Sequence, residues 1–147
     1  MSKVESFLSP ADEQEILNAI CTAERNTSGE IRVHIEKTTA ITAIARAKQV
    51  FIELKMNTTQ HANGVLIYVA VENKLFAICG DSGIDKVVPN DFWDKTKTAI
   101  ANNFARGQFK KGLIAGILMA GEQLKKYFPY DNVDDTNELP NEISFGK

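Results

Sequence analysis

Two apolar segments that fold back on each other constrain this sequence more than any other feature. Val65–Val71 is an almost continuous apolar run, which is typical of a strand covered on both faces. Glu72–Asn73 follows as a tight turn, because asparagine tolerates the left-handed backbone that such turns need. Leu75–Cys79 then runs back as a second strand. Since the open ends of a hairpin lie side by side, we expect Gly80–Asp81 next to Asn63–Gly64 at one edge of a sheet.

The segment before the hairpin predicts a parallel neighbour for it. Glu30–Glu36 alternates between polar and apolar side chains, so we expect a strand with one polar face, near a sheet edge or only partly covered. Thr42–Met56 is predicted to be a helix whose flank carries Ile44, Phe51, Ile52 and the stems of Lys48 and Lys55. Because a strand–helix–strand order requires a crossover, Glu30–Glu36 and Val65–Val71 should run parallel, with a right-handed connection.

The rest of the chain is predicted to be largely helical. The expected elements are a helix that begins after Ser9, a short strand over Ile84–Val88, and helices over Asp91–Ala105 and Phe109–Tyr127. Gly112 and Gly116 lie one turn apart on the last helix, and since glycine weakens a helix, we expect close packing on a neighbour there. The order of elements predicts an α/β protein whose small mixed sheet has a parallel crossover pair and an antiparallel hairpin strand.

Length and composition bound the class of protein. A chain of 147 residues with 44% hydrophobic and 24% charged residues suits one globular domain. We expect this domain over residues 1–130, and an acidic, loosely packed tail over residues 131–147. The net charge of −2, with both signs mixed along the chain, does not favour nucleic acid or an anionic membrane as a partner.

The cysteines and the absence of long apolar runs indicate a location. Cys21 and Cys79 form no C-x-x-C motif and no Cys/His cluster, and they are interpreted as two buried, reduced thiols. No segment resembles a signal peptide, and no apolar run approaches the roughly 20 residues of a membrane span. We therefore expect a cytoplasmic monomer without a membrane span.

Oxygen-bearing side chains from four segments are expected to meet at the open end of the hairpin. The crossover brings Glu30 to the sheet edge that holds Asn63, and the hairpin brings Asp81 and Asp85 there. The helix that begins at Asp91 follows closely. Because Ca²⁺ and Mg²⁺ prefer carboxylate and carbonyl oxygens on loops, these five residues are candidate ligands of Ca²⁺, with Mg²⁺ as the alternative. The simpler interpretation is a Gly/Asp turn followed by an ordinary helix cap.

Other polar residues indicate a site less strongly. Arg46, on the second predicted helix, is a candidate either to pair with a carboxylate or to bind an anion. His34 on a polar strand face and His61 in a loop have no identifiable Ser or Cys partner, so we interpret them as surface residues. The segment Gly80–Gly83 lacks the lysine and the spacing of a phosphate-binding loop.

Several motifs follow one another in a recognisable order. They are Ser28-Gly-Glu-Ile-Arg-Val33, Arg46 with Val50-Phe51, Asn63–Ala70, Gly80–Ile84 and Asn103–Leu113. Together they resemble the TPM domain, which was formerly a domain of unknown function. The resemblance covers about residues 10–127 and rests on the ordered series rather than on one motif. It implies a three-layer α/β/α sandwich with a small mixed sheet, in agreement with the predicted elements.

The resemblance also implies a function. The family includes a thylakoid lumen protein linked to photosystem II repair and many bacterial membrane-anchored proteins. The resemblance implies binding of divalent cations, chiefly Ca²⁺, and for the plant member an acid phosphatase activity. The functional loop of the family corresponds to Gly80–Ile84, beside Gly29–Glu30 and Asn63–Gly64. Many relatives have a signal peptide, a membrane helix or a Gly-rich tail, whereas this sequence resembles a small stand-alone soluble member.

Three hypotheses for function follow. The first is a Ca²⁺-binding accessory module with Asp81, Asp85 and Asp91 as side-chain ligands, supported by oxygens of Glu30 and Asn63. The second is a metal-dependent, acid-phosphatase-like hydrolase in which Arg46 contacts the phosphate. The third is a protein-interaction domain that uses the acidic tail.

Overall fold

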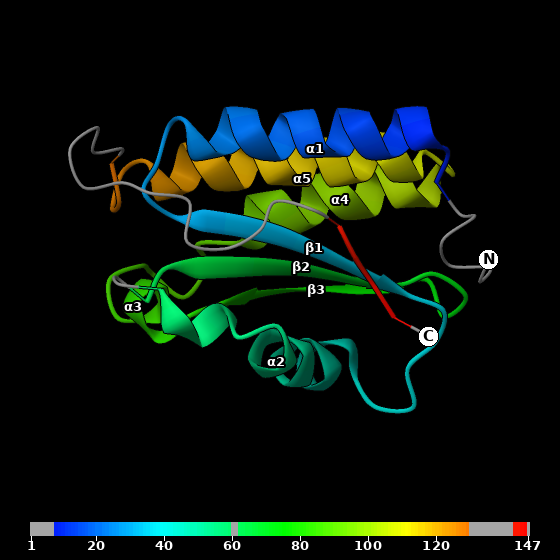
Figure 1. The fold of residues 1–147 in the computed structure, drawn as a ribbon, viewed down its shortest axis with the longest axis horizontal. Coiled ribbons are helices and arrows are strands. Elements are labelled where there is room, and N and C mark those ends of the chain that lie inside the picture. Colours follow the sequence, from blue (N-terminus) through cyan, green and yellow to red (C-terminus); the bar gives the residue numbers. More distant parts are fainter. Residues whose placement is uncertain (1–7, 60–61, 130–142, 147) are drawn as a thin grey trace.

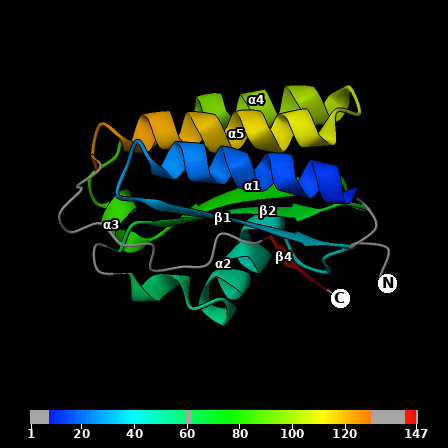
Figure 2. The ribbon, with the colours of Figure 1, turned by 45° about the horizontal axis from the view of Figure 1, so that its top comes forward.

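The chain forms a four-stranded mixed sheet with helices on both faces (Figure 1). A computed structural model describes residues 8–59, 62–129 and 143–146. One face carries α1 (Pro10–Glu24), α4 (Asp94–Ala105) and α5 (Phe109–Leu124), which lie side by side in Figure 2, and the other carries α2 (Ala43–Glu53) and the 3-10 helix η2 (Met56–Thr58). The strands are β1 (Glu30–Glu36), β2 (Gly64–Ala70), β3 (Leu75–Gly80) and β4 (Ser144–Phe145), with the short helix α3 (Ser82–Asp85) after β3. The predicted α/β/α sandwich is confirmed.

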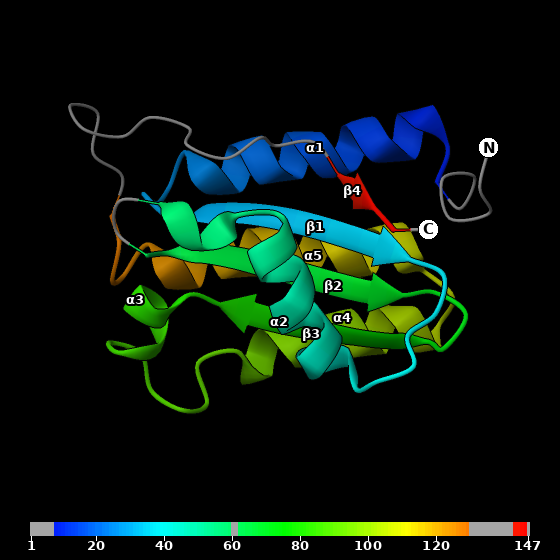
Figure 3. The same cartoon turned by 60° about the horizontal axis from the view of Figure 1, so that its bottom comes forward.

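The strand order β3-β2-β1-β4 confirms the predicted crossover and hairpin (Figure 3). β1 and β2 are parallel, with Glu30 opposite Gly64, and β3 returns antiparallel to β2. The two residues of β4 pair in parallel with His34 and Ile35 of β1, a contact that the sequence did not predict. All seven residues of β1 are buried, so this strand is not partly covered. The alternative prediction, a position near a sheet edge, is confirmed, because only β4 lies beyond β1 in the strand order.

Alternation along the inner strands divides the core into two layers. The larger layer, against α1, α4 and α5, contains the strand residues Ile31, Val33, Ile35, Val65, Ile67, Val69 and Ile78. The smaller layer, against α2, contains Ala47, Val50, Phe51, Met56, Leu66, Tyr68, Ala70, Ala77 and Cys79. Because side chains alternate across a strand, the polar residues of β1 lie on the α2 side and must be paired there.

The predicted close packing at the glycines of α5 is confirmed. A Cβ atom at Gly116 would lie 2.6 Å from Cδ1 of Ile100, and one at Gly112 would lie 2.8 Å from the ring of Phe104. Both contacts belong to α4, so the two helices approach each other where side chains are absent.

The segment after β3 differs from its prediction. The expected strand over Ile84–Val88 is wrong, because the amides of Ile84 and Asp85 both donate to the carbonyl of Asp81 and close a helical turn at 3.0 and 3.2 Å. The following helix begins at Asp94 rather than Asp91.

The predicted ends of two helices, and the predicted buried face of one of them, also differ from the structure. α2 ends at Glu53 because Lys55 adopts a left-handed backbone, with φ of 57°. Ile44 and Ile52 are 44% and 58% exposed, since the buried face of α2 consists of Ala47, Val50 and Phe51. The last helix ends at Leu124. His61 and the acidic residues at 131–142 lie outside the described residues, and within the described ranges no helix is long and apolar enough to cross a bilayer.

Candidate functional site

The open end of the β2–β3 hairpin joins the backbone segments predicted to meet there. The amide of Glu30 donates to the carbonyl of Asn63 at 3.3 Å, and the amide of Asp81 donates to the carbonyl of Gly64 at 3.0 Å. The side-chain amide of Asn63 donates to Oγ of Ser28 at 3.3 Å. Glu30, Gly64 and Asp81 therefore form one row across β1, β2 and the end of β3.

Asp81 is the residue at this end whose surroundings are incomplete. Its Oδ1 accepts a hydrogen bond from the amide of Ser82 at 2.7 Å and so caps α3. Its Oδ2 is buried and has no hydrogen-bond partner within the described part of the chain. Buried polar atoms are nearly always paired with protein, water or an ion, because an unpaired one costs roughly 1–3 kcal/mol. This oxygen therefore marks a place for a donor or a cation.

The two other predicted aspartates differ in their relation to Asp81. Asp85 is exposed on α3, one turn after Asp81, and its amide donates to the carbonyl of Asp81. Burial raises the pKa of the Cys79 thiol to about 11 against the charge of Lys48, and the charges of Asp85 and Asp81 add to the rise. Asp91 is exposed in the turn before α4, where its carbonyl accepts a hydrogen bond from the amide of Asp94 at 3.0 Å.

Glu30 belongs to a second acidic pair, on the other side of Gly64. The carboxylate of Glu24 accepts a hydrogen bond from the amide of Ile31 at 3.0 Å. Burial raises the pKa of Glu24 to about 7 against this hydrogen bond, and the charge of Glu30 adds to the rise. Glu30 is itself buried. The sequence did not indicate Glu24, yet it is a carboxyl that titrates near neutral pH.

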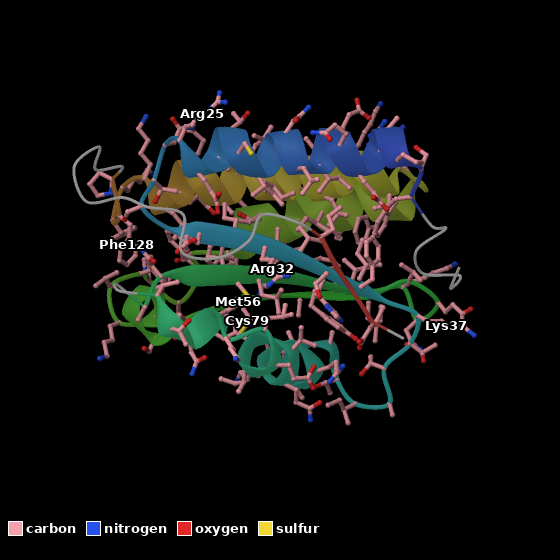
Figure 4. All side chains as sticks on the ribbon, in the orientation of Figure 1. Arg25, Arg32, Lys37, Met56, Cys79 and Phe128 are labelled. Atoms are coloured by element: carbon pink, nitrogen blue, oxygen red, sulfur yellow. The ribbon has the colours of Figure 1, made fainter. Side chains whose placement is uncertain are left out.

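Gly64 separates Asp81 from Glu30. A side chain at Gly64 would come within 3.1 Å of the carbonyl oxygen of Met56, so η2 packs directly on the backbone there, on the side of the sheet that also holds Cys79 (Figure 4). Since strands lie about 4.8 Å apart, the backbones of Glu30 and Asp81 are about 10 Å apart. No three His, Cys, Asp or Glu side chains among the described residues are grouped so that they could hold a metal ion. Ligands for a cation at Asp81 would therefore come from its own loop and from water.

A buried polar network fills the opposite end of β1, and the sequence did not predict it. The carboxylate of Glu36 accepts hydrogen bonds from Nε and Nη2 of Arg46, at 2.9 and 3.1 Å, and from the Tyr68 hydroxyl. Nε2 of His34 lies 3.1 Å from Oε1 of Glu36, and its ring stacks on Tyr68 with the centroids 5.9 Å apart. Oγ of Ser144, on β4, lies 2.9 Å from Nδ1 of His34. Both oxygens of Glu36 are thus paired.

This network decides between the interpretations of two residues. His34 is only 5% exposed, so its interpretation as a surface residue is wrong. Arg46 pairs with Glu36, one of its two predicted roles, and its Nη1 lies 3.3 Å from Glu53. Its other predicted role, anion binding, stays a prediction.

The protonation states in the network follow from burial and pairing. Burial alone would raise the pKa of Glu36, but the hydrogen bonds from Arg46, Tyr68 and His34 hold it below its usual value. Burial lowers the pKa of His34, against the hydrogen bond to Glu36. The hydrogen bond to Glu36 raises the pKa of Arg46, and burial raises that of Tyr68. At neutral pH the network contains a carboxylate, a guanidinium, a neutral imidazole and a neutral phenol.

One signal in the sequence could have indicated this network. Glu30–Glu36 has charged or polar residues at alternate positions, beside the fully apolar run Val65–Val71. A polar strand face next to a buried strand must itself be covered, and buried charges must be paired. A buried carboxylate on this strand therefore needs a positively charged partner on the helix that covers it. Arg46 is that partner.

The fold and the acidic loop define a class of protein: an α/β/α sandwich with a capping aspartate at the open end of a central hairpin. The family model described as the TPM domain matches residues 2–123, so the chain belongs to the TPM domain family, as its motifs predict. A search of curated proteins returned no match.

Solved structures share the fold over nearly the whole chain. The NMR structure of the BA42 protein from the psychrophilic bacterium Bizionia argentinensis is 57% identical, with a TM-score of 0.91 over 99% of this chain and 100% of that one. The N-terminal domain of the cg2496 protein from Corynebacterium glutamicum has a TM-score of 0.65 at 12% identity, over 97% of this chain and 82% of that one. The N-terminal domain of a P. gingivalis protein has a TM-score of 0.68 at 15% identity, over 85% and 82%. The last two show the fold alone.

Proposed function

We propose that this TPM domain binds a divalent cation, Ca²⁺ in the first place, at the Asp81–Asp85 loop and acts as a binding or accessory module. The observation that carries the proposal is the buried Oδ2 of Asp81, which has no hydrogen-bond partner among the described residues. A cation would supply its missing partner. Ca²⁺ takes about six to eight oxygen ligands in flexible geometry, including backbone carbonyls and water.

The described residues set the expected strength of binding. Asp81 and Asp85 supply two carboxylates one helical turn apart, and loop carbonyls and water would complete the shell. Few charged ligands on a short loop correspond to a Kd of about 10⁻⁴–10⁻³ M for Ca²⁺. Mg²⁺, which keeps several waters and is held by one or two carboxylates, is the alternative ion. Glu30 would not contact the cation directly, and its negative charge would favour binding. Asn63 would help to hold the backbone beside Gly64 in place, since its carbonyl accepts from the amide of Glu30.

Helix capping is the competing explanation for Asp81. Capping uses only Oδ1, and serine caps a helix about as well as aspartate does. An Asp81→Ser variant therefore keeps the cap and removes Oδ2. No hydrogen bond links Asp91 to Asp81 among the described residues, so the site proposed here leaves Asp91 out as a ligand, and Asp91→Ser is the matched control.

Titration of ¹⁵N-labelled protein with Ca²⁺ tests the proposal. We expect saturable shifts of the amide signals of residues 80–85, with a Kd in roughly the millimolar range. Asp81→Ser should abolish these shifts, and Asp91→Ser should leave them. Absence of shifts in the unmodified protein, or unchanged affinity in Asp81→Ser, contradicts the proposal.

The other two hypotheses stay predictions. The name of the matched family, TPM phosphatase, supports hydrolysis of phosphate esters, for which we expect a metal to be required. Hydrolysis of an aryl phosphate in Ca²⁺, Mg²⁺ or Mn²⁺, compared between the unmodified protein and Asp81→Ser, tests it. The protein-interaction hypothesis concerns the acidic segment 131–142, which lies outside the described residues.

A further inference from the structure

A nucleophile, a base and a carboxylate lie in hydrogen-bonded order at the C-terminal end of β1. Oγ of Ser144 is 2.9 Å from Nδ1 of His34, and Nε2 of His34 is 3.1 Å from Oε1 of Glu36. β4 brings Ser144 there from the other end of the chain, by pairing with His34 and its neighbour Ile35. A serine within reach of a base that a third group orients is the arrangement of nucleophilic hydrolases.

The hydrogen bonds of Glu36 determine which nitrogen of His34 carries the proton. The carboxylate already accepts from Arg46 and Tyr68, so it is ionised and has no proton to give. Nε2 of His34 must therefore donate to Glu36, which leaves Nδ1 without a proton. Nδ1 then accepts from the hydroxyl of Ser144. This is the polarity that a general base needs toward a serine, with the roles of the two imidazole nitrogens exchanged relative to the usual hydrolase arrangement.

The three residues open into a cavity of about 640 Å³. Its wall also includes Arg46, Thr39 and Gln49. Ser144 is partly exposed, and the side chain of Arg46 is 24% exposed, so a small molecule in the cavity would reach both. Arg46 is the positively charged residue among those named on this wall, where it pairs with Glu36 and Glu53.

We propose that Ser144, His34 and Glu36 hydrolyse small carboxylic esters in this cavity. Oγ of Ser144 attacks the carbonyl carbon while Nδ1 of His34 takes the hydroxyl proton. The bond to the leaving alcohol breaks, and this alcohol receives the proton from Nδ1, which leaves an acyl group on Ser144. Water then attacks the acyl carbon, its proton passes through Nδ1 to Oγ, and the acid is released. Glu36 holds the ring and stabilises the imidazolium that forms in each step.

The same contacts also anchor β4, and the test must separate the two roles. The amide of Gly146 donates to the carbonyl of Ile35 at 2.7 Å, and β4 pairs in parallel with β1. These backbone contacts hold the strand without the Ser144 hydroxyl. A purely structural role for this hydroxyl predicts no covalent chemistry at Oγ.

A fluorophosphonate probe and p-nitrophenyl acetate are the reagents for the test. We expect the probe to lose fluoride and to phosphonylate Ser144, which peptide mass spectrometry locates. We also expect an acetyl group on Ser144 during turnover of the ester. Ser144→Ala and His34→Gln should each lower the turnover rate by about 10²-fold or more. The serine control is Ser9→Asp, which keeps the helix-capping oxygen of α1 and should keep the rate.

Two results would overturn the proposal. One is a probe or acetyl adduct that forms elsewhere, or not at all, in the unmodified protein. The other is a Ser144→Ala variant that keeps its amide spectrum and turns over the ester as fast as the unmodified protein. The turnover rate should be the same in EDTA and in Asp81→Ser, which makes this result independent of the proposed cation site.

Discussion

The two ends of β1 carry polar groups of opposite character. At the C-terminal end, Glu36 accepts hydrogen bonds from Arg46, Tyr68 and His34, and both of its oxygens are paired. At the other end, across Gly64 from the start of β1, Asp81 has one oxygen that caps a helix and one that is buried without a partner in the described chain. Among the described residues, both oxygens of Glu36 therefore have partners, whereas Oδ2 of Asp81 has none.

This difference separates stability from ligand binding. A buried charge network whose members all have partners stabilises the arrangement that pairs them, and removal of one member leaves the others unpaired. A buried oxygen without a partner destabilises the chain alone, and stabilises its complex with whatever pairs it. We therefore expect substitutions at Glu36 to act on folding, and substitutions at Asp81 to act on the response to cations.

The largest expected effect is that of Glu36→Gln. The substitution keeps the size of the side chain but leaves the guanidinium of Arg46 without its carboxylate, and breaking a buried ion pair in this way costs about 3 kcal/mol. Urea denaturation at pH 7 measures the loss. The control is Glu53→Gln, because Glu53 contacts the same guanidinium from a side chain that is 59% exposed, and surface pairs contribute less than about 1 kcal/mol. Equal losses in the two variants would show that the network does not act as a buried unit.

Most of the fold could be predicted because its signals are local. Strict alternation in Glu30–Glu36, the apolar run Val65–Val71 and the turn after it determine two parallel strands and a hairpin. The error at Ile84–Val88 has the same origin, since apolar composition indicated a strand while the carbonyl of Asp81 closes a helical turn at 3.0 Å. β4 could not be predicted, because a strand of two residues has no periodicity and Ser144 meets its partner 110 residues away.

The two ends of β1 also differ in how well the sequence predicts them. Asp81 lies in a Gly/Asp segment whose chemistry is visible within five residues, and backbone pairing alone brings Gly64 beside it. The network around Glu36 depends on contacts across 10 residues to Arg46 and 32 residues to Tyr68. Within its own segment, each of these residues is consistent with an exposed or core position. Only the packed structure shows that they contact one another.

The next effect concerns pH and the acidic pair beside Glu30. The pKa of Glu24 is about 7 in the folded chain against 4.5 in its ordinary state, so the folded chain holds the proton more tightly than the unfolded one. Its contribution to stability is therefore present below about pH 4.5 and is lost as the pH rises to about 7. The pKa of Glu36 is lowered, so its effect has the opposite sign. Its contribution to the stability of the fold is present above the usual pKa of a glutamate and is lost as the pH falls below it.

Glu24→Gln tests this opposition between the two ends. Glutamine resembles the protonated acid and can still accept the hydrogen bond from the amide of Ile31. We expect little change in the free energy of unfolding at pH 4.5, and a gain of up to about 3 kcal/mol at pH 8. Denaturation curves across this range measure the gain. Glu122→Gln, at an exposed position of α5, should change stability by less than about 0.5 kcal/mol at every pH. A gain in Glu24→Gln that is the same at both pH values would contradict the raised pKa.

The smallest expected effect is that of a cation on stability. In EDTA, Asp81→Ser should be about 1 kcal/mol more stable than the unmodified protein, because serine keeps the cap of α3 and removes the buried oxygen that has no partner among the described residues. With 10 mM Ca²⁺ and a Kd of roughly 1 mM, the unmodified protein should gain about 1.4 kcal/mol, and its Tm should rise by about 4 °C. Asp81→Ser should gain nothing, whereas Asp91→Ser should gain as much as the unmodified protein. Thermal unfolding followed by circular dichroism measures all three. If Asp81→Ser gained the full amount, the buried Oδ2 of Asp81 would have no part in cation binding.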